Sequence, residues 1–233
     1  MKFFRKPVAG LSVVCLLSFL MSSCVKDNVN YAPPPVALVS FFQASPDQPA
    51  LDLFLNSDQV NALPLSYGTG VGYFRAYTGQ RTVNFYVHAV MSAAYSDTAT
   101  FKPNQVYSLF LANSVAKPDL IVLKDTINQP PANMATIRFV DLSPDAPAVD
   151  LALSDSVKVS NRSYKGFSTF VPVTGNKSYT LQVIQHNTTT VLASLTGVTL
   201  SAGSVYTIML TGFASGTTST DKLAVYYVAN AYY

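Results

Sequence analysis

The sequence predicts an all-β chain of two tandem immunoglobulin-like β-sandwich domains joined by a short Pro-containing linker. Residues 45–52 (SPDQPALD) return as residues 143–150 (SPDAPAVD), with six of eight positions identical. Tyr, Phe, Val, Leu and Thr, which favour strands, are abundant, tryptophan is absent and all 12 acidic residues are aspartate. Short runs of alternating apolar and polar residues are separated by turn residues, a pattern typical of sandwich folds.

Residues 1–23 have the pattern of a signal peptide, in which basic residues precede an apolar stretch. That stretch covers residues 8–21 and is too short for a membrane span, which needs roughly 20 residues. It ends in LMSSC, which resembles the bacterial lipobox, so Cys24 is the expected lipidation site, with palmitate among its acyl chains. Cys15 lies in the segment to be removed, so Cys24 has no cysteine partner. An ordinary secretory peptide is the alternative.

The segment after the cysteine predicts the location of the protein. Residues 25–28 (VKDN) resemble an export signal of Gram-negative lipoproteins, so we expect an outer-membrane protein, surface-exposed and anchored in the lipid bilayer through acylated Cys24. A periplasm-facing protein is the alternative. Residues 24–36 form the tether, and its proline run favours an extended spacer.

The charge balance excludes one class of partner. Removing residues 1–23 takes away three of the 15 Lys and Arg and leaves 12 cations against 12 aspartates. A nucleic-acid partner requires a clustered basic patch, and the sequence has no such run, so we expect no nucleic-acid binding.

Period-two patterns place the strands and the domain boundaries. The first domain, residues 37–127, has expected strands at 37–43, 51–56, 71–77, 81–89, 95–101, 105–113 and 119–124. The linker is 128–134. The second domain, residues 135–233, has expected strands at 135–142, 149–154, 167–173, 178–186, 191–200, 204–212 and 222–229. Breakers such as Gly79, Pro103, Gly175 and Gly203 separate them.

The repeated phrase, followed by an alternating strand, a Gly-bearing turn and a Val-Tyr strand (Val106-Tyr107, Val205-Tyr206), resembles the family called domain of unknown function 4397. Two tandem copies would cover nearly all of residues 37–229. The resemblance implies an exported, envelope-associated β-sandwich module, and it supplies no catalytic residues.

The repeated phrase is the first candidate site. Its members are Ser45, Pro46, Asp47, Pro49 and Asp52, with Ser143, Pro144, Asp145, Pro147 and Asp150 in the second copy. Its aspartates suit a hard cation such as Ca²⁺, but two carboxylates are few for such a site. We therefore favour a structural motif, in which Asp47 and Asp145 cap turns by accepting backbone N–H bonds and Asp52 and Asp150 anchor strand starts.

The remaining candidates argue against an enzyme. An alignment on the turn glycines places His88 opposite Ile184, so the copies are expected to share no histidine site, and each histidine is expected at a strand end on the surface. The mature chain lacks the Cys and His spacing of a zinc site, and without glutamate a glycoside hydrolase would need an aspartate pair. The glycines of residues 68–72 precede a strand, which does not fit a phosphate loop. We expect no metal, no cofactor and no catalytic residue.

The expected function is therefore a non-enzymatic surface lipoprotein for binding, adhesion or scaffolding, with an unidentified protein or glycan partner. The first alternative is a glycan-capture lipoprotein of a polysaccharide uptake system, and the second is an envelope hydrolase. Aromatic side chains that would contact a ligand, for instance by stacking on a sugar, are Tyr73, Phe74, Tyr77, Tyr232 and Tyr233.

Overall fold

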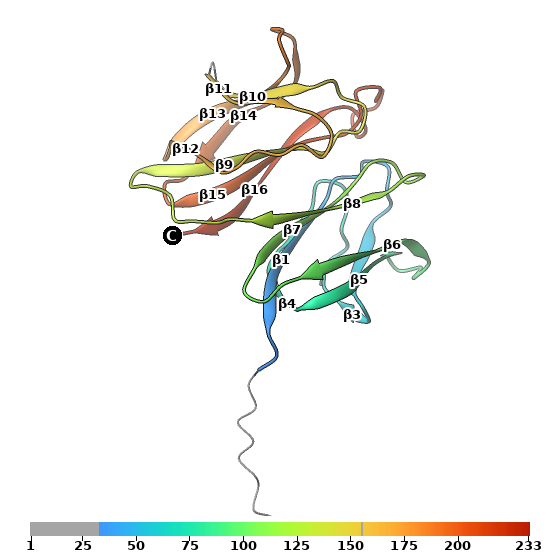
Figure 1. Ribbon diagram of the computed structural model, residues 1–233. Helices are drawn as coiled ribbons and strands as arrows, with labels where there is room; N and C mark the ends of the chain where they lie inside the picture. Colours follow the sequence, from blue (N-terminus) through green and yellow to red (C-terminus); the bar gives the residue numbers. More distant parts are fainter. Residues whose placement is uncertain (1–32, 155) are drawn as a thin grey trace, which may run out of the picture. The chain divides into compact units, whose positions relative to one another are not determined.

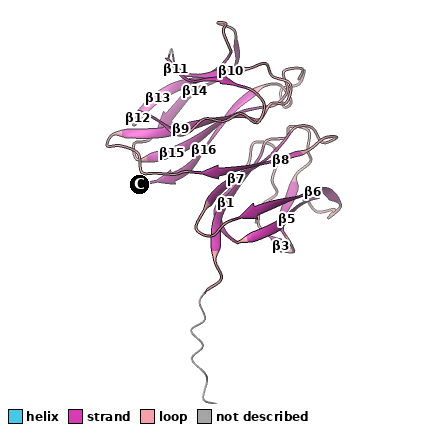
Figure 2. Cartoon of the chain, viewed as in Figure 1, coloured by secondary structure: helices cyan, strands magenta, loops and turns pink. Residues whose placement is uncertain are grey.

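The computed structural model describes residues 33–154 and 156–233, and these residues form strands and loops with no helix (Figures 1 and 2). In this part of the chain there is accordingly no helix that is long and apolar enough to cross a membrane. The expected signal peptide, Cys24 and most of the tether lie outside the described residues. Residues 35–233 belong to one compact unit.

The first sandwich contains strands β1 to β8. Their bounds are β1 Val36–Gln43, β2 Leu51–Leu55, β3 Asp58–Gln59, β4 Gly70–Tyr77, β5 Gly79–Val87, β6 Ala93–Phe101, β7 Val106–Ala112 and β8 Asp119–Asp125. They form two four-stranded sheets, with strand orders β4-β1-β7-β8 and β3-β2-β5-β6. Strand β1 pairs antiparallel with β4 and parallel with β7.

The second sandwich repeats this plan with strands β9 to β16. Their bounds are β9 Met134–Asp141, β10 Val149–Leu153, β11 Ser156–Arg162, β12 Val171–Thr174, β13 Lys177–Gln185, β14 Val191–Leu200, β15 Ser204–Thr211 and β16 Ala224–Tyr232. The sheet orders are β12-β9-β15-β16 and β11-β10-β13-β14, and β9 again pairs parallel with β15. The predicted fold class, two tandem immunoglobulin-like sandwiches, is confirmed.

Each sandwich closes its own core with alternate strand residues. In the first, Phe41 of β1 and Phe85 of β5 are buried from opposite sheets, and their ring centroids lie 5.3 Å apart. In the second, Phe139 of β9 and Leu181 of β13 are fully buried. Because side chains alternate along a strand, the intervening residues of β1 and β9 point away from these cores.

Residues that point away from these two cores form a third core, which joins the two sandwiches. It contains Phe42, Ala44, Phe110, Ala112, Ile121 and Leu123 from the first sandwich and Val140, Leu142 and Met209 from the second. The sheets β4-β1-β7-β8 and β12-β9-β15-β16 therefore pack on each other, and all eight residues of β15 are buried. Strand β15 includes buried Ser204, Thr207 and Thr211, so it lacks the continuous apolar run that is typical of strands buried on both faces.

Two short-range features differ from the expected strands. The prediction contains neither β3 nor β11, each of which pairs with the strand before it in a hairpin. Strand β3 consists of two polar residues. In β11, Val157 and Val159 alternate with polar residues, but Val157 is exposed and Val159 alone is buried, so the apolar signal is short. In place of the expected strand 167–173, β12 is confined to four residues and is preceded by the isolated bridge of Phe167 with Val140.

Candidate binding site

The repeated phrase joins distant loops. In the first copy, buried Ser45 donates its hydroxyl hydrogen to the carbonyl oxygen of Asn113, and Asp47 accepts the backbone N–H of Val115 at 2.8 Å. In the second copy, Asp145 accepts the backbone N–H groups of Ala214 at 2.7 Å and Ser215 at 2.9 Å. The first aspartate of each phrase therefore caps a loop 68–70 residues away, and the expected backbone acceptor role holds with a distant partner.

The residue two positions before each phrase holds its serine. The side-chain amide of Gln43 donates to the carbonyl oxygen of Ser45 at 3.0 Å and accepts its N–H at 2.6 Å. In the second copy, Asp141 accepts the N–H of Ser143 at 3.0 Å, and its other oxygen is buried without a partner. Burial raises the pKa of the Asp141 carboxyl to about 7, against a smaller lowering by the Ser143 bond.

The second aspartate of each phrase pairs with a histidine, which corrects the alignment made from the sequence. The Nδ1 atom of His88 lies 3.0 Å from both carboxylate oxygens of Asp52, and that of His186 lies 2.8 Å from Oδ1 of Asp150. The backbone N–H of each histidine also donates to an equivalent backbone carbonyl, that of Ala50 for His88 and that of Ala148 for His186. The copies do share a histidine site.

The turn before the strand explains the wrong alignment. Gly79 is the first residue of β5, whereas Gly175 lies in the turn before β13, so matching the two glycines shifts the strands by two residues. Asp52 also departs from the expected role, because its carboxylate contacts the Asn61 amide and His88 rather than backbone N–H groups. Asp150 does accept a backbone N–H, that of Asn161 at 2.7 Å.

These pairs do not have the geometry of a hydrolytic triad. Ser160 Oγ lies 3.5 Å from Nδ1 of His186, the same ring nitrogen that faces Asp150. A triad requires the nucleophile and the carboxylate on opposite ring nitrogens. Within the described residues, no group of three or more His, Cys, Asp or Glu is placed to hold a metal ion.

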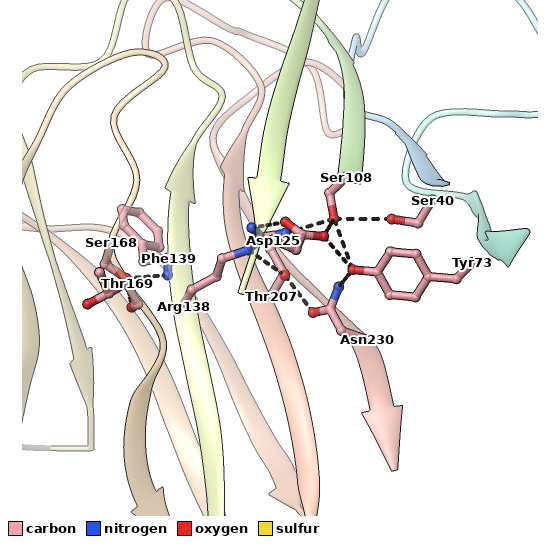
Figure 3. Close-up of polar contacts among 10 residues, drawn as sticks. All are labelled: Ser40, Tyr73, Ser108, Asp125, Arg138, Phe139, Ser168, Thr169, Thr207 and Asn230. Atoms are coloured by element: carbon pink, nitrogen blue, oxygen red, sulfur yellow. Dashed lines mark hydrogen bonds and ion pairs between the residues drawn. The ribbon is translucent and has the colours of Figure 1, made fainter. Parts of the chain in front are cut away.

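A buried polar network crosses the joint between the sandwiches (Figure 3). Arg138 of β9 donates to Asp125 at the end of β8, to Ser108 Oγ at 2.8 Å and to Thr207 Oγ1 at 2.9 Å. The side chains of Arg138 and Asp125 are 2% and 0% exposed. The Phe170 ring centroid lies 5.0 Å from the Arg138 guanidinium carbon.

Tyr73 continues the network towards β16. Its hydroxyl donates to Asp125 and accepts the amide N–H of Asn230 at 3.0 Å, while Thr207 donates to the Asn230 carbonyl oxygen at 2.6 Å. Burial, followed by the charge of Asp125, raises the pKa of Tyr73 to about 12. The Tyr73 hydroxyl is therefore neutral and bonded within the protein, and the role of the Tyr73 ring as a ligand-stacking surface stays a prediction.

A cleft opens beside this network, with a volume of about 220 Å³. We call it the interdomain cleft, because both sandwiches line it. Its lining residues are Ser40, Phe41, Phe42, Gly70, Val71, Gly72, Tyr73, Ser108, Leu109, Phe110, Thr207, Val228, Ala229 and Asn230. No charged residue is among them. Domain interfaces with a few convergent polar groups are common ligand sites.

A second cavity of about 350 Å³ lies beside Arg138 and is lined by Lys124, Thr126, Asn128, Arg138, Phe167, Ser168, Thr169 and Phe170. Further cavities flank β4, and one of them includes Asp58. Asp58 is the one carboxylate that lines any of these four cavities in the described part of the chain. None of the four therefore presents the carboxylate pair of a glycoside hydrolase.

The other proposed aromatic contacts lie in different places. Phe74 packs against the first core and, together with Tyr77, lines a cavity of about 240 Å³ beside β4, so its role as a ligand contact stays a prediction. Tyr77, Tyr232 and Tyr233 are 55%, 75% and 59% exposed. None of these four residues lines the interdomain cleft.

Arg138 is the residue that sequence reasoning missed. It stands between apolar neighbours on β9, at the position that Ser40 occupies on β1. An outward-pointing arginine on a strand is normally exposed to solvent. Here the packing of one sheet on the other buries it. An arginine directly between the apolar residues Ile137 and Phe139 was the available signal.

Comparisons with known proteins find similarity to one family of unknown function. The family described as "Domain of unknown function (DUF4397)" matches residues 37–152, which cover the first sandwich and the first two strands of the second. No curated protein matches the chain. A solved structure titled "Alpha-glucan binding by a streptococcal virulence factor" aligns over 82% of this chain and 96% of its own, at 9% identity and a TM-score of 0.23. So remote an alignment carries no argument about function.

Proposed function

We propose that the chain is a non-enzymatic lipoprotein of a bacterial cell envelope that binds a partner in the interdomain cleft. In this proposal, Cys24 carries the acyl chains, residues 24–36 form the tether and residues 37–127 and 135–233 are two copies of the matched family's module. The protein would lie in the outer membrane and face the cell surface. The lipobox-like LMSSC sequence supports the anchor.

The observation that carries the binding role is the composition of the cleft. Ser40 donates its hydroxyl hydrogen to Ser108 at 3.1 Å, which leaves lone pairs on Ser40 Oγ as acceptors. Asn230 uses one amide hydrogen on Tyr73 and retains the second as a donor. The cleft thus offers both an acceptor and a donor on side chains that are held by the buried network.

A glycan is the partner class that this lining favours. The cleft combines hydroxyl and amide groups with the half-buried apolar residues Val71, Val228 and Ala229 and contains no charge. Neutral sugars present hydroxyl groups and apolar ring faces, so they match both kinds of surface. Glycan capture for polysaccharide uptake is therefore the second candidate function, alongside binding of a protein partner.

The test is to fill the cleft. A Cβ atom on Gly72 would meet no heavy atom within 4 Å, so Gly72→Phe is expected to occupy the cleft without disturbing the fold. Mature protein and the variant are screened on glycan and protein arrays. We expect Gly72→Phe to abolish binding to any partner that the unaltered protein captures.

Thr98→Phe is the matched control, because Thr98 is an exposed position on β6 and does not line the cleft. It should retain full binding. Equal binding by Gly72→Phe and the unaltered protein would remove the cleft from the proposal. Separately, a Cys24→Ser chain should not incorporate labelled palmitate; incorporation at the unaltered level would refute the anchor.

A further inference from the structure

The positive charges of the first sandwich gather at one end. We call this the tether end, because β1 begins there at Val36, directly after Pro35. The N–H of Thr78 donates to the Pro35 carbonyl at 3.3 Å, and that of Asn104 donates to the Val36 carbonyl at 3.0 Å. The turns β4–β5 and β6–β7 therefore surround the point at which the chain enters the sandwich.

Residues 37–127 contain five Lys and Arg, and four of them lie within two positions of a strand end at the tether end. These four are Arg75, Arg81, Lys102 and Lys124. Arg75, Lys102 and Lys124 are exposed, and Arg81 is half-buried. Within the described part of the chain, none of the four forms an ion pair.

Acidic groups at the same end are few. Asp125 is neutralised by its ion pair with Arg138. Asp58 faces Leu55 at the end of β2, and Asp97 of β6 lies at the same level, because Leu55 faces Val83 and Val83 faces Asp97. Four cations against these two aspartates leave an excess of two positive charges. The opposite end carries Asp47, Asp52 and Asp119, with Lys117 as its one Lys or Arg among residues 37–127. Asp119 forms an ion pair with Lys165 of the second sandwich at 2.6 Å.

Tyr77 gives the tether end an aromatic member. Its side chain is 55% exposed. Arg81 is fixed beside it, because its guanidinium donates to the carbonyls of Tyr77 at 3.1 Å and Thr78 at 2.6 Å and lies 6.0 Å from the Tyr77 ring centroid. Exposed tyrosines and basic side chains are typical of protein surfaces that lie at the headgroup level of a bilayer.

We propose that the tether end docks on the anionic headgroup surface of the membrane that holds the lipid anchor. This inference rests on the proposed anchoring at Cys24. Twelve residues run from Cys24 to Pro35, and a chain of that length spans at most about 40 Å. The cationic end is the part of the first sandwich that the tether brings to the membrane, whereas the acidic end lies on the far side.

The experiment uses the mature protein, purified from membranes and reconstituted into vesicles of phosphatidylcholine, with or without phosphatidylglycerol. Hydrogen–deuterium exchange is measured for the tether-end turns, residues 77–81 and 102–106, and for the opposite-end loops, residues 44–50 and 113–118. We expect slower exchange in the tether-end turns on anionic vesicles alone, and reversal by salt.

The patch variant changes Arg75, Arg81, Lys102 and Lys124 to Gln. The matched control changes Lys158, Arg162, Lys177 and Lys222 of the second sandwich to Gln, which removes the same net charge. Each lost tether-end cation should weaken the anionic-surface contact about fivefold. The patch variant should therefore lose the protection, and the control should keep it. Circular dichroism checks that both retain the β fold.

The outcomes separate this inference from the anchor. Flotation with neutral vesicles reports the anchor, and failure there contradicts the proposed function alone, because anionic vesicles still report the patch. Equal loss of protection in both variants, or protection of the opposite-end loops, would overturn the docking surface. So would competition by inorganic phosphate beyond that of chloride at equal ionic strength, because it would indicate a discrete phosphate site.

Discussion

Removing Arg138 should destabilise the joint between the sandwiches more than any surface change. Arg138 is a buried cation that donates hydrogen bonds to Asp125, Ser108 and Thr207. Arg138→Met leaves Asp125 buried without its counter-charge, and breaking such a pair costs about 3–5 kcal/mol. Asp125→Leu leaves the guanidinium unpaired and should cost a similar amount.

The double variant tests the physical reason. When both charges are removed, no uncompensated charge remains, and an apolar replacement of a buried pair is often near neutral. Here the hydroxyls of Ser108, Tyr73 and Thr207 lose partners, which adds about 1–3 kcal/mol for each one that stays unsatisfied. The double variant should therefore be less destabilised than the sum of the single variants, by about 3 kcal/mol.

Urea unfolding of the four proteins gives this double-mutant cycle. The single variants should also separate one cooperative transition into two, because the joint is weakened while each sandwich keeps its own core. Single-variant costs below about 1 kcal/mol, or strictly additive costs, would refute the argument that the buried pair holds the joint.

Three further perturbations follow from buried or paired groups. Burial raises the pKa of Asp141 to about 7, so the folded chain keeps a proton that the unfolded chain loses, and stability falls as pH rises from about 4 to 7. Asp141→Asn supplies an amide, as Gln43 does in the first copy. Its free energy of unfolding in urea should equal that of the unaltered protein at pH 4 and exceed it at pH 8, by at most about 4 kcal/mol. An equal difference at both pH values would contradict this. Burial opposes ionisation of Asp150, but bonds from Asn161, Ser160 and His186 outweigh it and lower the pKa. The stabilisation is present above the pKa of the unfolded state and is lost as pH falls through the pKa of the folded state. Asp150→Ala should therefore lower the free energy of unfolding by about 1 kcal/mol at pH 7 and by less below pH 3. A cost that does not depend on pH would count against the ionised pair. Met209→Ala, at a fully buried position of the joint, should cost about 2–5 kcal/mol in urea unfolding, whereas a cost below 1 kcal/mol would show that the joint collapses around the cavity.

Local patterns account for most of the strands but not for the edge hairpins. Alternation along β2, β5 and β13 marks one buried face, so these strands were predictable from period two. Strand β11 lies at the edge of its sheet and buries Val159 alone, so its alternating signal is limited to Val157 and Val159. The pairing of His88 with Asp52 and of His186 with Asp150 was obscured by a turn in which the glycine changes its position relative to the strand.

The sequence by itself determined the fold class and the duplication, because strand periodicity and repeated turn residues are local properties. It also indicated Asp47 and Asp145 as backbone acceptors, but their partners lie 68–70 residues away and were set by the tertiary structure. Tertiary structure decided what the outward residues do. Ser40, Tyr73, Ser108 and Arg138 alternate with core residues and would face water on an isolated sandwich. Only the packing of one sheet on the other buries them, pairs Arg138 with Asp125 and opens the interdomain cleft, since burial of an outward face depends on a partner surface that no local pattern encodes.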